Sequence, residues 1–361
     1  MSEAEILARV EGAVGRITLN RPKALHALNT AMCAQMSAAL MGFAEDPKVA
    51  FVLLDHAEGT RGFCAGGDIR LLAESGRGDG AAADAFFRVE YRLNHQISMF
   101  PKPYVAVLDG ITMGGGFGVS VHGSHRIATE ATVFAMPETA IGLIPDVGGG
   151  YVLPRLAGEI GMWLALTGLR LKGADVVQGG IATHFVPGPV LPAMKSALLA
   201  ASSADGVEAV LPEFTTPPAA ASFAPQRGLI DHCFGGDSVE DILARLGAQD
   251  DPWAAATHAD LLTKSPQALK VTFRQMREGR ALASLAEALE REFRIASRCV
   301  RRHDFAEGVR ALIIDKDNAP RWNPTKLEDV SADLLDSIFA PLPESEMWTP
   351  LASAVPGNSR Q

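Results

Sequence analysis

Apolar and polar positions alternate at the start of the chain and then change to helical spacing. Ile6–Val10 and Gly15–Leu19, on either side of a Glu11-Gly12 turn, predict a β-hairpin. Asn29 is the predicted N-cap of the helix that follows. The residues predicted on its buried face are Met32, Met36, Leu40 and Phe43. The apolar run Val49–Asp55 then predicts a buried strand.

A second unit repeats this order of strand, glycine turn and helix. The predicted elements are a loop over Gly76–Ala83, a helix from Asp84 to about Phe100, a strand at Tyr104–Leu108, a turn at Gly110–Gly116, a short helix at Phe117–His122, and strands at Arg126–Ala128 and Val133–Ala135. Strands that alternate with helices in this way predict an α/β protein.

The second half of the chain is predicted to be helical. Ser202–Pro225, rich in Ala, Pro and Ser, is typical of a linker. The predicted helices are Ser238–Leu246, Asp251–Thr263, Pro266–Glu278 and one from Ser284, where Glu287 completes a capping box. From about Pro341 the chain is typical of a frayed tail. The predicted division is therefore a core over 1–200, a helical region over 201–340 that covers the site, and a tail over 341–361.

Composition and charge exclude several classes of function. The 361 residues are 47% hydrophobic and 21% charged, as in ordinary globular proteins. The net charge of −9 argues against nucleic acid or an anionic membrane as the main partner. The most membrane-like window, Tyr104–Val121, contains Asp109 and five glycines, so we expect a buried strand and helix there rather than a span.

The cysteines and the first residues bear on location. Cys33, Cys64, Cys233 and Cys299 form no C-x-x-C pair, which favours a reducing compartment over a disulfide framework or a zinc ribbon. Met1–Ile6 has neither a secretory nor a transit pattern. On these grounds we expect a cytoplasmic protein.

Two glycine-rich turns, Phe63–Ile69 and Gly110–Gly118, are the first candidates for chemistry. A glycine turn that opens a helix presents unpaired backbone N–H groups to an anion. If the two turns converge, the N–H groups of Gly67 and Gly115 form a two-donor oxyanion hole. The alternative is that the glycines only permit tight turns and close packing.

Other chemistries fit the sequence poorly. The position that a dinucleotide-binding G-x-G-x-x-G requires for its last glycine holds Val121, and no P-loop pattern is present. The segment around Ser120 lacks the last glycine of a nucleophile elbow, so a Ser120 hydrolase with His122 or His125 as base is weakly supported. His122, His125 and His184 have no carboxylate or cysteine at supporting spacing, and we expect no metal site.

Glu138 and Asp146 are acids within apolar and glycine-rich sequence. A carboxylate there is costly unless it is paired, hydrogen-bonded or functional. An apolar pocket would raise the pKa of such a carboxyl group and prepare it for acid/base work or nucleophilic attack. The alternative is helix capping, because each acid directly follows a proline, Pro137 or Pro145.

These segments resemble the crotonase, or enoyl-CoA hydratase/isomerase, superfamily, and within it the 3-hydroxyisobutyryl-CoA hydrolases. The resemblance rests on Gly110-Ile-Thr-Met-Gly-Gly-Gly, Phe134-Ala-Met-Pro-Glu-Thr-Ala-Ile-Gly-Leu, Pro145-Asp-Val-Gly-Gly-Gly, Leu169-Arg-Leu-Lys-Gly, Gly180-Ile-Ala-Thr-His-Phe, His303-Asp-Phe-Ala-Glu-Gly-Val-Arg310 and Asp315-Lys-Asp317. It implies a spiral of strand-strand-helix turns with a helical C-terminal region that covers the site and often mediates trimers.

The resemblance also implies roles for particular residues. The oxyanion donors correspond to the N–H groups of Gly67 and Gly115, and the catalytic carboxylate to Glu138. Asp146 matches the second acid of the hydrolases, and Glu90 the acid that contacts the hydroxyl end of the substrate. The expected substrate-binding set is therefore Glu90, Gly115, Glu138 and Asp146.

One position departs from the hydratases of the superfamily. Gly118 stands where they carry a second catalytic glutamate, which makes hydration of an enoyl double bond hard to run. The resemblance therefore implies thioester hydrolysis of a short 3-hydroxyacyl-CoA, foremost 3-hydroxyisobutyryl-CoA in valine breakdown. CoA would be part of the substrate, with no separate cofactor. Lys23 and the C-terminal basic helix are candidate contacts for its nucleotide end. A hydratase or isomerase and a non-catalytic scaffold remain alternatives.

Overall fold

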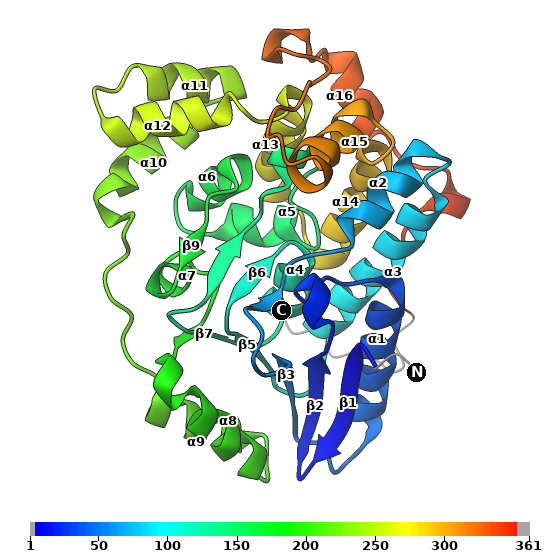
Figure 1. The fold of residues 1–361 in the computed structure, drawn as a ribbon, viewed down its shortest axis with the longest axis vertical. Helices are drawn as coiled ribbons and strands as arrows, with labels where there is room; N and C mark the ends of the chain where they lie inside the picture. The colour runs from blue at the N-terminus through cyan, green and yellow to red at the C-terminus, as the bar shows by residue number, and fades with distance from the viewer. Residues whose placement is uncertain (1–3, 352–361) are drawn as a thin grey trace.

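The computed structural model describes residues 4–351, which form two β-sheets and the helices around them (Figure 1). The larger sheet consists of β1 (Ile6–Glu11), β2 (Val14–Leu19), β3 (Phe51–His56), β5 (Tyr104–Leu108), β7 (His125–Ala128) and β10 (His184–Phe185), in that order. The smaller sheet consists of β4 (Gly62–Cys64), β6 (Ile111–Met113), β8 (Val133–Ala135) and β9 (Leu171–Lys172). The predicted hairpin β1-β2 is antiparallel, and β2 to β10 run parallel.

The chain crosses between the two sheets in a repeated pattern. Each repeat places one strand in the larger sheet and one in the smaller sheet, and then forms a helix. The repeats are β3, β4 and α2 (Ile69–Arg77), then β5, β6 and α4 (Gly115–Val121), then β7, β8 and the 3-10 helix η2 (Glu138–Ile141). Because β4, β6 and β8 are parallel neighbours, the segments that leave their C-terminal ends lie at one edge of the smaller sheet. The predicted α/β spiral is confirmed.

The larger sheet is buried on both faces, which explains why its strands contain apolar runs rather than clear alternation. On β3, Val52 and Leu54 face the core shared with α1 (Thr30–Glu45) and α3 (Ala81–Ser98). Phe51 and Leu53 face the core shared with α8 (Leu191–Ala200) and α9 (Asp205–Phe214). Figure 1 shows these two pairs of helices on opposite sides of the sheet.

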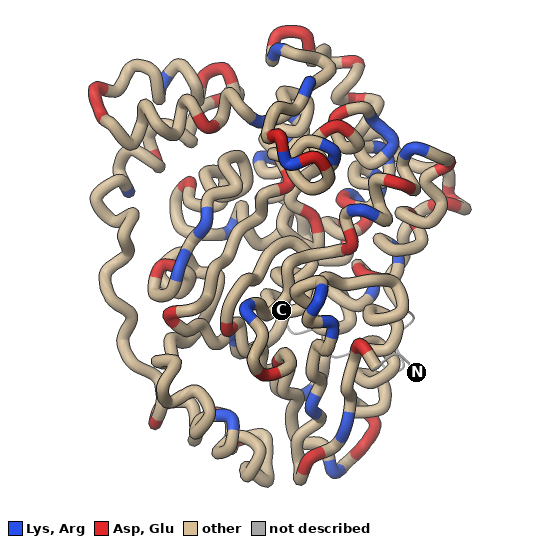
Figure 2. The backbone as a smooth tube through the Cα atoms, viewed as in Figure 1, with Lys and Arg blue, Asp and Glu red and all other residues tan. Residues whose placement is uncertain are grey.

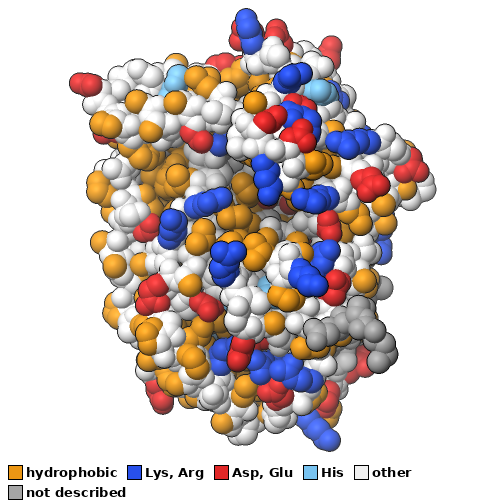
Figure 3. Space-filling view, in the orientation of Figure 1, with side chains coloured by type: hydrophobic (Ala, Val, Ile, Leu, Met, Phe, Trp, Pro, Cys, Tyr) orange, Lys and Arg blue, Asp and Glu red, His pale blue; other side chains and the backbone are white. Residues whose placement is uncertain are grey.

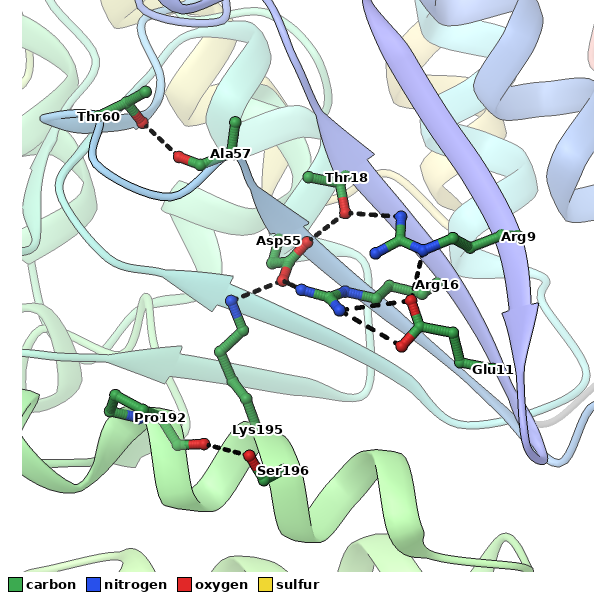
Figure 4. Close-up of polar contacts among 10 residues, drawn as sticks. All are labelled: Arg9, Glu11, Arg16, Thr18, Asp55, Ala57, Thr60, Pro192, Lys195 and Ser196. Carbon is green, nitrogen blue, oxygen red and sulfur yellow. Dashed lines mark hydrogen bonds and ion pairs between the residues drawn. The ribbon is translucent and has the colours of Figure 1, made fainter.

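A buried charge cluster fastens α8 to the larger sheet (Figure 4). Oδ2 of Asp55, at the end of β3, accepts from Arg16 of β2 and Lys195 of α8 at 2.7 and 2.6 Å. Oδ1 of Asp55 accepts from the hydroxyl of Thr18 at 2.7 Å. Because every oxygen of this buried carboxylate has a partner, Asp55 links two strands and a helix that are far apart in sequence.

The C-terminal region is helical, as predicted. Its helices are α10 (Arg227–Phe234), α11 (Val239–Gly247), α12 (Pro252–Leu261), α13 (Pro266–Gly279), α14 (Leu285–Cys299), α15 (His303–Val309), a π-helix (Arg310–Ile314) and α16 (Ala332–Phe339). The Ser284 hydroxyl accepts from the amide of Glu287, and the Glu287 carboxylate accepts from the amide of Ala283, close to the predicted capping box. In Figure 1, α10 to α12 lie at the edge of the molecule, where α10 and α12 pack against α6 (Ile160–Thr167), whereas α14 packs against α3.

Several predictions of irregular chain are wrong. The predicted turn Gly110–Gly116 contains β6, and the predicted turn Phe63–Ile69 begins within β4. Within the predicted linker Ser202–Pro225, residues Asp205–Phe214 form α9, whose Val207 and Leu211 are buried against the larger sheet. The Ala, Pro and Ser residues that suggested a linker lie mostly on either side of α9, and Pro212 lies within the helix. The boundary predicted at residue 200 thus falls between two helices that pack on the same sheet.

The segment after Pro341 is also ordered as far as residue 351. The indole of Trp348 is only 2% exposed, and Arg88 of α3 donates to the carbonyl oxygens of Glu346 and Met347 at 2.7 and 2.8 Å. Prolines and polar residues suggested a frayed end. Nothing in the sequence indicated the packing of Trp348, because the indole N–H donates to the carbonyl of Arg88, more than 250 residues away. The rest of the predicted tail, 352–361, lies outside the described residues.

Among residues 4–351, no helix has both the length and the apolar character needed to cross a membrane.

Candidate active site

The five predicted site residues, Gly67, Glu90, Gly115, Glu138 and Asp146, all line one cavity of about 390 Å³. The cavity lies where the chain leaves the C-terminal ends of β4, β6 and β8. Most of its wall is apolar, which leaves few polar groups to orient a ligand. On this face of the molecule, Figure 3 shows a hydrophobic hollow with Lys and Arg side chains around it.

Two backbone N–H groups converge on the cavity from different turns. Gly67 lies after β4, in a segment that forms a bridge with Leu28. The Leu28 amide donates to the carbonyl of Gly66, and the N–H of Gly67 has no acceptor among the described residues. Gly115 is the first residue of α4, so its N–H has no acceptor within the helix. A Cβ built on Gly66 would lie 3.9 Å from the nitrogen of Gly115, which shows how closely the two turns approach.

Glu138 is the first residue of η2 and directly follows Pro137, as the helix-start alternative predicted. Its side chain nevertheless faces the cavity: a Cβ built on Gly114 would lie 3.1 Å from its Oε1. The carboxyl group is buried, and its Oε2 has no hydrogen-bond partner among the described residues. Burial, and then the charge of Asp146, raise the pKa of Glu138 well above its ordinary value.

Asp146 lies in the turn between η2 and α5 (Gly149–Val152) and is buried. Its Oδ2 accepts a hydrogen bond of 2.6 Å from the hydroxyl of Tyr91. Burial raises the pKa of Asp146 to about 6, against the hydrogen bond from Tyr91, which favours the ionised form. A group with this pKa can exchange a proton near neutral pH.

Glu90 of α3 is the third buried carboxyl group of the cavity. Its Oε1 has no hydrogen-bond partner among the described residues, and a Cβ built on Gly115 would lie 2.6 Å from it. Burial, then Asp146, then Glu138 raise the pKa of Glu90 well above its ordinary value. The charge of Asp146 thus disfavours the ionised form of both Glu90 and Glu138.

A comparison with known proteins supplies the family. The model of the enoyl-CoA hydratase/isomerase family matches residues 14–339. The chain belongs to this family. The 3-hydroxyisobutyryl-CoA hydrolase of Xenopus laevis is 48% identical over 92% of this chain and 87% of its own length. The human enzyme of the same name is 45% identical over 95% and 90%. Both of these names also carry the word mitochondrial.

Solved structures agree on the fold. A carnitinyl-CoA dehydratase from Mycobacterium thermoresistibile superposes with a TM-score of 0.89 at 43% identity, over 94% of this chain and 97% of its own. An enoyl-CoA hydratase from Rhodobacter sphaeroides superposes with a TM-score of 0.88 at 42% identity, over 96% and 100%. The fold of the enoyl-CoA hydratase/isomerase family therefore extends through the C-terminal helices.

The cytoplasmic location expected from the sequence is wrong, because the vertebrate relatives in this family are named as mitochondrial proteins. The four cysteines are free and buried, as expected in a reducing compartment. Free thiols do not distinguish one reducing compartment from another. Residues 1–3, on which part of the expectation rested, lie outside the described residues.

The structure adds residues in and beside the cavity that sequence reasoning missed. Tyr91 contacts the cavity acid Asp146 but does not itself line the cavity. It follows Glu90 on α3, where an aromatic residue of a helix gives no signal of its own. Arg170 lines the cavity from the turn before β9. Leu312 and Ile313 of the π-helix and the nearby Asn318 close the cavity from the C-terminal region. These residues are far from the family's glycine turns in sequence, and only packing brings them to the cavity.

The other candidates lie elsewhere. Ser120 is buried in α4, where its hydroxyl donates to the carbonyls of Gly116 and Phe117 at 2.8 and 3.1 Å, so no base activates it. His122 bonds the carbonyl of Val147, and His125 bonds Glu208 at 2.9 Å. Within residues 4–351, no group of three or more His, Cys, Asp or Glu side chains is placed to hold a metal ion.

Proposed function

We propose that the chain hydrolyses the thioester of a short 3-hydroxyacyl-CoA, foremost 3-hydroxyisobutyryl-CoA, to the free acid and CoA. The observation that carries this proposal is the position of Glu138, a buried carboxyl group with an unpartnered oxygen in the same cavity as two free N–H groups. The relatives named 3-hydroxyisobutyryl-CoA hydrolase, at 43–48% identity, support the choice of reaction.

The thioester carbonyl oxygen is placed between the N–H groups of Gly67 and Gly115. As the carbonyl carbon becomes tetrahedral, its oxygen gains negative charge, and two fixed donors stabilise that charge more than the neutral ground state. Neither donor has to give up another hydrogen bond. This is the electrostatic part of the mechanism.

Glu138 supplies the bond-making step by one of two routes. In the first, its carboxylate attacks the carbonyl carbon, the C–S bond breaks, and the sulfur takes a proton from Asp146. Water then cleaves the mixed anhydride and returns a proton to Asp146. In the second, Glu138 takes a proton from water as the oxygen attacks, and passes that proton to the departing sulfur. Both routes consume one water and leave the carboxyl groups unchanged.

Glu90 provides the preference for a hydroxyl group. Its Oε1 is buried, unpartnered and adjacent to Gly115, so a 3-hydroxyl on the acyl chain can donate to it. An acyl group without this hydroxyl leaves the acceptor unpaired, which is the stronger kind of discrimination that a buried polar group allows.

Positive charge near the cavity suits the phosphates of CoA, despite the net charge of −9. Arg170 lines the cavity. On the face that holds the hollow, Lys and Arg positions are spread over the backbone (Figure 2). CoA enters as part of the substrate, and the proposal includes no separate cofactor. We expect a homo-oligomer, as in many members of the family, which sedimentation equilibrium would test.

Gly118 favours hydrolysis over hydration. A Cβ there would lie 2.6 Å from Cβ of Val147 and 2.9 Å from Nδ2 of Asn94, so the site has no room for a second carboxylate on α4. We would assay free thiol with DTNB for 3-hydroxyisobutyryl-CoA, 3-hydroxypropionyl-CoA and butyryl-CoA, and follow enoyl absorbance with crotonyl-CoA. Thiol release that is faster for the two hydroxyacyl thioesters supports the proposal. Loss of enoyl absorbance without thiol release would overturn it.

A further inference from the structure

Glu292 of α14 is a buried carboxyl group that does not line the cavity. Its side chain is 1% exposed and lies on the apolar face of the helix, between Leu289 and Phe293. Its Oε2 accepts from the N–H of Gly148 at 2.7 Å, and its Oε1 from the N–H of Gly150 at 2.8 Å. A carboxyl group is costly to bury among apolar side chains, so the two hydrogen bonds from backbone N–H groups are what stabilise it here.

The held backbone is the turn that carries Asp146. Val147 has φ of 52° and Gly148 φ of 90°. A β-branched residue is strained in the left-handed region and persists there only when its surroundings impose it. Two further contacts restrain the turn: Nε2 of Gln275 donates to the carbonyl of Pro145 at 2.9 Å, and His122 bonds the carbonyl of Val147 at 2.8 Å.

We propose that Glu292 is a positioning residue for Asp146: by holding the Gly148 and Gly150 amides, it keeps the strained turn in the conformation in which Asp146 meets Tyr91 and faces the cavity. The proposal rests on the hydrolase function proposed above. It gives the C-terminal region a role in the active site beyond covering it, because α14 determines where an acid of the N-terminal core points.

Glutamine is the informative replacement at position 292. It has nearly the size of glutamate, but its amide nitrogen cannot accept a hydrogen bond, so one of the two glycine N–H groups loses its partner. Glu290→Gln is the matched control, since it makes the same change on the same helix at a partly exposed side chain whose nearest cation is Arg294 at 3.9 Å. Melting temperatures of both variants establish that they fold.

The decisive experiment is a double-mutant cycle on thiol release. As a single substitution, Glu292→Gln should lower kcat by about tenfold or more and change KM less than about twofold. The reason is that a displaced Asp146 slows thioester cleavage more than it weakens substrate binding. When Asp146→Asn is already present, adding Glu292→Gln should leave kcat almost unchanged. Glu290→Gln should leave kcat unchanged with Asp146 or with Asn at position 146. An equal loss in both backgrounds would overturn the proposal, because Glu292 would then act through general stability.

A second measurement needs no turnover. Carboxyl-labelled aspartate, followed by ¹³C NMR and assigned with Asp146→Asn, reports the pKa of Asp146 directly. Burial raises the pKa of Glu292 to about 8, so this group is protonated where Asp146 titrates, and glutamine changes its charge little. Loss of the Tyr91 hydrogen bond should therefore raise the pKa of Asp146 in Glu292→Gln and not in Glu290→Gln. An unchanged or lowered pKa would overturn the proposal.

Several titratable groups surround the turn. Those facing Asp146 are Tyr91 and Glu90 of α3, Glu138 of η2, Glu292 of α14, and His122 next to Val147.

A second variant covers the case in which Glu292→Gln does not fold. Gln275→Ala removes the hydrogen bond to the carbonyl of Pro145, so it should loosen the same turn and change both measurements in the same direction. If the unsubstituted protein releases no thiol, the hydrolase proposal fails, and the NMR titration still decides whether Glu292 positions Asp146.

Discussion

The hydroxyl of Tyr91 donates a 2.6 Å hydrogen bond to Oδ2 of Asp146, which joins α3 to the turn before α5. Glu90, the residue before Tyr91, faces the same cavity. One turn of α3 therefore presents an unpartnered acid to the cavity and a donor to a second acid. Burial raises the pKa of Asp146 and the hydrogen bond from Tyr91 lowers it, and the net result is a pKa of about 6.

Tyr91→Phe should raise the pKa of Asp146 above about 6, because the charged form loses its hydrogen-bond donor while burial stays. Because the first route needs protonated Asp146 to supply the proton to the departing sulfur, the alkaline limb of the kcat/KM profile should then move to higher pH. Tyr104→Phe is the control, since it loses a comparable bond to the Val119 carbonyl away from the cavity. An alkaline limb that shifts equally in both variants would contradict the assignment.

Glu138→Gln should abolish most thiol release, by at least about a hundredfold, because neither attack on the carbonyl nor proton transfer from water remains possible. The fold should be retained, since glutamine fits the volume and removes a carboxyl group whose ionisation burial already disfavours. DTNB assays and a thermal melt measure the two effects. Near-normal thiol release by this folded variant would remove Glu138 from the mechanism.

Gly115→Ala should lower kcat/KM by about a hundredfold, the usual cost of losing one oxyanion donor. The added Cβ would lie 2.6 Å from Oε1 of Glu90 and 3.2 Å from a side-chain carbon of Leu28, so the N–H of residue 115 must move. Gly42→Ala is the control: its Cβ meets nothing within 4 Å, and alanine within α1 should stabilise the protein by about 0.5–1 kcal/mol. Equal activity of the two variants would exclude Gly115 as a donor site.

Asp55→Asn should lower the free energy of unfolding by about 3 kcal/mol at neutral pH, because Arg16 and Lys195 would lose a buried partner. Burial alone would raise the pKa of Asp55, but Lys195 and Arg16 outweigh it and lower the pKa below 3.8. The stabilisation is therefore present above pH 3.8 and lost as the pH falls through the lower folded-state pKa, so the two proteins converge in acid.

Denaturant titrations at pH 7, 5 and 3 would measure this convergence. Asp336→Asn, at an exposed pair with Arg274, should change stability by less than about 1 kcal/mol at any of them. A difference between Asp55→Asn and the unsubstituted protein that stays constant down to pH 3 would contradict the role of the buried ion pairs.

Local patterns were sufficient for β1, β2, β3, β5, β7 and β8, but not for β4 and β6, which lie in segments predicted to be turns. Apolar runs bounded by glycine predicted the strands of the larger sheet, and side chains such as Asn29 and Ser284 marked helix starts. Glu138 and Asp146 stood out because an acid in apolar sequence is rare without a reason. The resemblance to a family then assigned roles to these residues before any distance was known.

The sequence by itself therefore determined the family, the spiral of strands and helices, and the five candidate residues, because glycine turns, caps and misplaced acids are local signals. Only the tertiary structure decided that Tyr91 meets Asp146, that Leu312 and Ile313 close the cavity, and that α9 and Trp348 are packed rather than loose. Glu292 lies between these cases: it interrupts an apolar stripe, yet its partners 142 and 144 residues away exist only after folding. Contacts over such separations depend on how whole elements pack, and no short stretch of sequence encodes them.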